Sequence, residues 1–95
     1  MADEIPEYLS FASDGSHVDI TLPRAATFAG VEQQTLRMRE PTVEDQVVAS
    51  EMKGSDATRE ISMFANLCEV SPEEIRVLPM RSFRRLQKAY GHFLD

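Results

Sequence analysis

The side chains of this chain that could do chemistry are few and lie far apart in the sequence. There is one cysteine, Cys68, and there are two histidines, His17 and His92. A metal site would need two or three further ligands at a workable spacing, and the sequence offers none beside them. A single cysteine on the apolar side of a helix is most often a packed core thiol. We therefore expect no metal, no cofactor and no cysteine nucleophile.

A group of carboxylates, Glu40, Glu44 and Asp45, is the other feature that could suggest acid–base catalysis. Their position has a simpler explanation. Thr42 can cap a helix by accepting a hydrogen bond from the backbone N–H near Asp45, and negative charge stabilises the positive end of a helix dipole. The sequence also lacks a glycine-rich phosphate loop, a nucleophile elbow and a dinucleotide fingerprint. We expect a protein without enzymatic activity.

Two strands are predicted near the start of the chain. Residues 17–22 and residues 31–39 each alternate between apolar and polar side chains, which is typical of half-buried strands. In the second strand, Arg37 and Arg39 share the polar face, opposite Leu36. The pair is most simply an antiparallel hairpin, which must lie on helices to be stable.

The segments around these strands are expected to be irregular. Residues 23–30 would form a loop of about eight residues between the two strands. Residues 1–16 show no sustained period, so we expect a flexible tail there. Tyr8, Leu9 and Phe11 are large and apolar, and they could instead dock on the domain or on a neighbour.

The rest of the chain is predicted to be helical. Helical spacing and capping signals predict four helices, from Thr42 to about Lys53, from Ser55 or Asp56 to Cys68, from Ser71 to Leu78, and from about Met80 to Leu94. The third opens with a capping serine, a proline and a glutamate three residues after the cap. The predicted fold class is therefore α+β and mostly helical, an N-terminal antiparallel β-hairpin followed by about four helices, with residues 17–95 as a single domain.

Charge is unevenly distributed along the chain, whose net charge is −6. Residues 1–75 carry five basic and fifteen acidic side chains, whereas residues 76–95 carry five basic and one acidic. The basic end could contact an acidic partner or a nucleic-acid backbone. No run approaches the roughly 18 apolar residues of a membrane helix, and the start lacks a signal-peptide profile. We expect a cytoplasmic protein with no membrane partner.

DNA binding is the alternative function that the helices suggest. The two helices joined at residues 69–71 imitate a helix-turn-helix, and a small regulator of that type is the alternative function. Such a regulator would contact DNA through Arg76, Arg81, Arg84 and Arg85. Its reading helix would, however, present two glutamates, and the acidic body opposes approach to DNA. We expect no nucleic-acid partner.

Several short motifs occur in a recognisable order from Ile20 to Leu94. They are the strand ending in Leu22-Pro23, Gly30 opening a second strand with Leu36, the corner Arg39-Glu-Pro-Thr-Val-Glu-Asp45, Asn66-Leu67-Cys68, Val70-Ser-Pro-Glu-Glu-Ile75, and a last amphipathic helix ending in Phe93-Leu94. By these features the chain resembles the small tail assembly chaperones of contractile-tailed phages and prophages of the Mu-like and P2-like kinds.

The resemblance implies a non-enzymatic tail assembly chaperone. Such proteins coat the tape measure protein while tube subunits polymerise around it, in the cytoplasm of the bacterial host, and they are absent from the mature virion. The implied partners are the tape measure protein and, as a second candidate, the tail tube protein. Family members often have a longer form made by ribosomal frameshifting, and this chain would be the short form. Weak self-association through the open hairpin edge would suit a coating role.

The interaction residues expected from the sequence are mostly basic. Arg37 and Arg39 project from the polar face of the second strand, and the others lie on the last helix. The full set is Arg37, Arg39, Met80, Arg81, Arg84, Arg85 and Lys88. Met38, Met52 and Met63 could also serve an adaptable apolar surface, or else fill the core.

Overall fold

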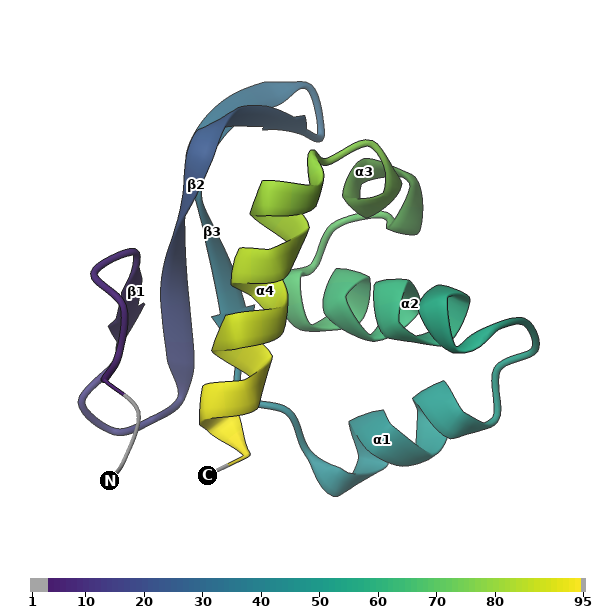
Figure 1. Cartoon of the computed structure of the whole chain (residues 1–95). Helices are drawn as coiled ribbons and strands as arrows, with labels where there is room; N and C mark the ends of the chain where they lie inside the picture. The colour runs from purple at the N-terminus through teal and green to yellow at the C-terminus, as the bar shows by residue number, and fades with distance from the viewer. Residues whose placement is uncertain (1–3, 95) are drawn as a thin grey trace.

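The computed structural model describes residues 4–94, which form a three-stranded antiparallel sheet followed by four helices (Figure 1). The strands are β1 (Leu9–Phe11), β2 (His17–Phe28) and β3 (Val31–Arg39), side by side in the order β1-β2-β3. The helices are α1 (Val43–Ser50), α2 (Asp56–Cys68), α3 (Pro72–Arg76) and α4 (Met80–Phe93). The predicted α+β class, a sheet followed by four helices, is confirmed.

The sheet has one strand more than the predicted hairpin. Residues 9–11 form β1, which pairs antiparallel with β2 in the register Leu9 opposite Ile20. Leu9 is buried, and the ring of Phe11 meets the ring of Phe93 edge-on with their centroids 5.1 Å apart. The expected tail over residues 1–16 therefore contains a strand of the domain, because its apolar residues dock against α4. Residues 1–3 lie outside the described part of the chain.

The predicted loop over residues 23–30 is also wrong, because β2 continues through it to Phe28. The ladder shifts register between Thr21 and Ala26, which accommodates Pro23 within the strand. The turn itself has only two residues, Ala29 and Gly30, with φ of 53° and 79°. Positive φ at both positions is the mark of a tight type I′ turn, which glycine and asparagine adopt with less strain than alanine.

The core lies between the inner face of the sheet and the helices α2 and α4. Val18, Ile20 and Leu22 of β2 are almost fully buried, as their alternation predicts. Figure 1 shows α4 lying across the sheet. The centre of its buried face carries the small side chains Ser82 and Ala89 on either side of Leu86, and small residues let a helix approach a sheet closely.

The helix starts follow the predicted capping residues. Thr42, Ser55 and Ser71 each accept a hydrogen bond from the backbone three residues later, and Thr42 and Ser71 form complete capping boxes. The carboxylate of Glu74 also accepts a bond from the backbone N–H of Ala29 at 2.5 Å. That contact holds the tip of the β2–β3 hairpin against α3.

Helix α1 differs most from the other helices, because it packs on the body through few side chains. It ends at Ser50 rather than near Lys53, and only Asp45 and Ala49 among its residues are buried. In Figure 1 it lies at the edge of the molecule, and the gap between α1 and α2 widens from the loop that joins them toward the sheet.

Candidate partner-binding surfaces

A polar junction built on Asp45 joins the sheet to α1 and α2. The Asp45 carboxylate accepts two hydrogen bonds from the Arg39 guanidinium, at 2.7 and 2.8 Å, and one from the Asn66 amide at 2.9 Å. The backbone N–H and the hydroxyl of Thr42 donate two more, at 2.8 and 3.0 Å. Hydrogen bonding to Arg39, above all, holds the pKa of the Asp45 carboxyl well below its usual range.

The junction explains the corner motif of the sequence in structural terms. Arg39, Thr42 and Asp45 close the turn from β3 into α1, and Asn66 attaches that turn to α2. The carboxylate is nearly buried, so its five hydrogen bonds offset the cost of removing it from water. No catalytic use of Asp45 is needed to explain it.

Two of the expected interaction residues are held in internal ion pairs. Arg39 is committed to Asp45, and Arg37 pairs across the strands with Asp19, with two hydrogen bonds of 2.8 and 3.2 Å. The Arg37 contact also lowers the pKa of the Asp19 carboxyl. Arg37 is largely exposed and can still meet a partner, whereas Arg39 has a structural role first.

Arg85 is likewise occupied within the domain. Its guanidinium donates to the backbone carbonyl of Thr21 at 2.7 Å and lies over the ring of Tyr8, 4.2 Å from the centroid. The cation–π contact attaches α4 to the residue before β1, and the hydrogen bond attaches it to β2. The sequence did not predict this role of Arg85, because residues 1–16, which include Tyr8, were expected to form a flexible tail.

The remaining basic residues of α4 are free of such contacts. Arg81, Arg84 and Lys88 are exposed, and within residues 4–94 none of them forms an ion pair. We call these three residues the α4 basic face. Met80 lies beside them and is 61% exposed. Met38 and Met63, in contrast, are buried in the core, as expected of core-filling methionines.

An exposed apolar surface lies on α1 and just after it, and of its residues only Met52 was named as a surface candidate from the sequence. Val43 is 82% exposed and Val48 is 48% exposed, and Val47 and Met52 are also open to solvent. The spacing of these residues in the sequence predicts one apolar face of a helix, packed against the body. The helix instead rests on Ala49, so most of its large apolar side chains remain uncovered.

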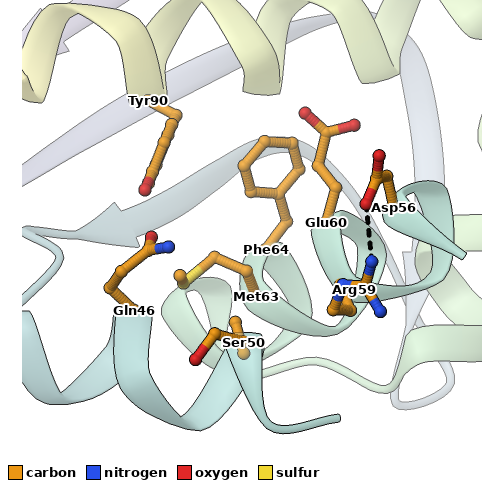
Figure 2. A pocket seen from close by; sticks show the side chains of 9 residues that line it. Gln46, Ser50, Asp56, Arg59, Glu60, Met63, Phe64 and Tyr90 are labelled. Atoms are coloured by element: carbon orange, nitrogen blue, oxygen red, sulfur yellow. Dashed lines mark hydrogen bonds and ion pairs between the residues drawn. The ribbon is translucent and has the colours of Figure 1, made fainter. Parts of the chain in front are cut away.

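Hollows lie on both sides of the contact between α1 and α2. The first, of about 550 Å³, is lined by both helices and by Tyr90 of α4. Figure 2 shows Gln46 and Ser50 projecting into it from α1, opposite Met63 and Phe64 of α2. Its rim carries the ion pair of Asp56 with Arg59, and its lining is mixed polar and apolar.

The second hollow is more apolar and has a volume of about 500 Å³. We call it the α1–α2 groove. Its lining residues are Asp45, Val48, Ala49, Met52, Ser62, Met63, Ala65, Asn66, Val70 and Pro72. The carboxylate and amide of the Asp45 junction are therefore at one side of it, already hydrogen-bonded to each other.

The residues that could suggest chemistry are not assembled into a site. Burial raises the pKa of the Cys68 thiol to about 12, which disfavours the reactive thiolate. Within residues 4–94 no group of three or more His, Cys, Asp and Glu side chains is placed to hold a metal ion. None of the helices in that part of the chain is long and apolar enough to span a bilayer.

The predicted helix-turn-helix contacts are not favoured by the arrangement either. The helix that would read DNA, α3, has only five residues. One of its two glutamates, Glu74, is fixed by the cap at Ser71 and by the hairpin tip. Arg76 reaches back to the hydroxyl of Thr58, 3.5 Å away.

Comparison with models of known protein families gives a match. Residues 19–95 match the family model described as phage tail assembly chaperone proteins, E, or 41 or 14. The chain belongs to this family. The match runs from β2 to the end of the chain, so the Asp45 junction, the α1–α2 groove and the α4 basic face all lie within the family domain of this tail assembly chaperone. No curated protein and no solved structure matches the chain.

Membership confirms the resemblance stated from the sequence motifs. The family supports a role in tail assembly through interaction with phage tail proteins, and it suggests a non-enzymatic protein.

Proposed function

We propose that this tail assembly chaperone binds the tape measure protein of its phage and keeps that protein soluble while the tail tube assembles. The observation that carries the proposal is the uncovered apolar surface of α1 in a member of this family. An exposed apolar patch on a small protein is typical of a protein-binding surface. A tape measure protein, with long apolar helical stripes, is a partner that such a surface fits.

The proposal involves binding only and no chemical step. Several copies would bind along one tape measure protein, so that weak individual contacts add to a high overall affinity. Assembly would take place in the bacterial cytoplasm, and the chaperone would leave before the virion matures. The α4 basic face, with Met80 and Arg37, is the second candidate contact surface, and the tail tube protein is the second candidate partner.

Co-expression with the tape measure protein encoded in the same tail gene cluster tests this function. We expect the tape measure protein to be soluble and to co-purify with several copies of the chaperone, and to be insoluble when expressed alone. Expression with the tube protein in place of the chaperone is the control. A tape measure protein that stays insoluble beside the chaperone, or that is soluble alone and does not bind it, would contradict the proposal.

A further inference from the structure

We propose that the α1–α2 groove binds one amphipathic helix of the partner, whose apolar stripe is flanked by lysine or arginine side chains. This inference rests on the proposed function, because it names the chemistry of the segment that the chaperone recognises. Three properties of the groove support it: its apolar lining, the adaptability of that lining, and the charge of its surroundings.

The lining supplies an apolar surface that is open before any partner arrives. Val48 and Met52 are 48% and 39% exposed, and Val70 and Pro72 also line the groove. The exposed lining residue Met52 is an unbranched thioether that can fit side chains of different shape, and the thioether of Met63 lies buried beside the groove. A groove of this kind suits the apolar stripe of a helix, which presents side chains at i, i+3, i+4 and i+7.

The charges around the groove select the flanks of that helix. Glu44 and Glu51 lie four and three residues from Val48 and so share its side of α1. Glu69 and Glu73 are sequence neighbours of the lining residues Val70 and Pro72. All four glutamates are exposed, and within residues 4–94 none forms an ion pair. Their negative charge complements a basic helix and repels an acidic one.

The other charged groups near the groove do not cancel this preference. Lys53, the neighbour of the lining residue Met52, is exposed and basic, but the four glutamates outnumber it. Asp45 and Arg39 neutralise each other through two hydrogen bonds. The mixed hollow on the other side of α1 is a poorer candidate, because the charges on its rim are already engaged. Asp56 pairs with Arg59, and Glu60 accepts hydrogen bonds from the Gln87 amide.

Binding of two synthetic peptides to the full chain tests the inference. Both peptides carry a leucine stripe at helical spacing over about 20 residues, long enough to form a helix. One has lysine flanks and the other glutamate flanks, and fluorescence anisotropy measures the Kd. We expect the lysine peptide to bind about tenfold more tightly or better. Equal affinities, or binding of neither peptide, would overturn the inference.

Substitutions on two sides of α1 locate the binding surface. Val48→Glu places a charge in the groove and is expected to weaken lysine-peptide binding about tenfold. Val43→Glu adds the same charge to the same helix, on the side away from the groove, and should change the Kd less than about twofold. Equal effects of the two substitutions would show that the groove is not the site. Thermal unfolding of both variants verifies that they fold.

A charge reversal tests the role of the glutamates separately. Glu51→Lys with Glu69→Lys changes two residues at the ends of α1 and α2, where positive charge also stabilises the helix dipole. This variant should therefore fold, and it should lose the preference for the lysine peptide, because the two new lysines offset the two glutamates that remain. An unchanged preference for the lysine peptide would overturn the charge argument.

Failure of this inference can be told apart from failure of the proposed function. If the wild-type chain keeps the tape measure protein soluble and Val48→Glu does so equally well, the groove is wrong and the function stands. If the wild-type chain fails while the lysine peptide still binds the groove, the function is wrong. Self-association that Val48→Glu abolishes, with no peptide binding, would identify the groove as a contact between copies and overturn the inference.

Discussion

At the scale of single residues, the most informative side chain is Asp45. Its carboxylate accepts bonds from β3, from the cap of α1 and from α2, so one residue determines where α1 leaves the sheet. Arg39, the ion-pair partner of Asp45, has a structural role for the same reason. The sequence marked it as an interaction residue because it lies on the polar face of a strand, but a nearby buried carboxylate is its partner.

Asp45→Asn is expected to lower the free energy of unfolding by about 3 kcal/mol at pH 7, because it removes the charge that Arg39 faces. The pKa of Asp45 is depressed in the folded chain, so its stabilisation is complete above the unfolded pKa, near 3.8, and is lost as pH falls through the folded pKa. The wild-type chain should therefore lose stability below about pH 4 more steeply than the variant. Urea unfolding across a pH series measures both effects.

Glu44→Gln is the matched control for that series, since it neutralises the neighbouring exposed carboxylate of α1. We expect it to retain the steep loss of stability in acid. An Asp45→Asn variant as stable as the wild-type chain at pH 7, with the same dependence on pH, would show that the junction contributes little.

At the scale of elements, local signals and distant contacts determined different parts of the fold. The cap at Ser71 and the box at Thr42 are formed by neighbouring residues, and both occur as predicted. Strand β1 depends instead on residues far away, since Phe11 needs Phe93 and Tyr8 needs Arg85. The hairpin turn was not predicted, because its first residue, Ala29, occupies a left-handed conformation that an alanine side chain disfavours.

Ala29→Gly should therefore stabilise the protein by about 0.5–1 kcal/mol, because glycine adopts the positive φ of the turn without steric cost. Thermal unfolding gives the shift in Tm. Ala57→Gly, the same substitution in the regular backbone of α2, should have the opposite sign. A destabilised Ala29→Gly variant would indicate that the Ala29 methyl group makes a contact that outweighs the relief of strain.

At the scale of the whole molecule, the chaperone is polarised. The glutamates around the α1–α2 groove and the α4 basic face carry opposite charges, and neither set is neutralised by ion pairs within the described residues. Opposite charges on two surfaces orient a partner during approach, and they affect the rate of association more than the final affinity.

Replacing Arg81, Arg84 and Lys88 together by glutamine should slow association with the tape measure protein and weaken its dependence on salt. Because all three are exposed, we expect the free energy of unfolding to change by less than about 1 kcal/mol. Stopped-flow mixing at several salt concentrations measures the association rate and its dependence on salt. Arg85→Gln is the contrasting variant, since loss of its bond to Thr21 and its contact with Tyr8 should lower stability instead.

An unchanged association rate and salt dependence in the triple variant would show that the α4 basic face does not meet the partner. The same result would not contradict the proposal for the α1–α2 groove, because the two surfaces carry opposite charge and are varied separately.

The sequence by itself determined the properties that depend on neighbouring residues. Alternation placed Val18, Ile20 and Leu22 in the core, and capping residues located the starts of three helices. The order of the short motifs was sufficient to indicate the family. These signals are local because hydrogen bonds of a cap and the period of a strand span only a few residues.

Only the tertiary structure decided which residues are left for a partner. Arg85 was expected to be an interaction residue, yet its guanidinium donates to the carbonyl of Thr21, 64 residues away in the chain. The valines of α1 have the pattern of a packed helix, yet they are exposed because α1 rests on Ala49. Exposure and pairing depend on contacts between residues far apart in the chain, and a sequence pattern does not contain those distances.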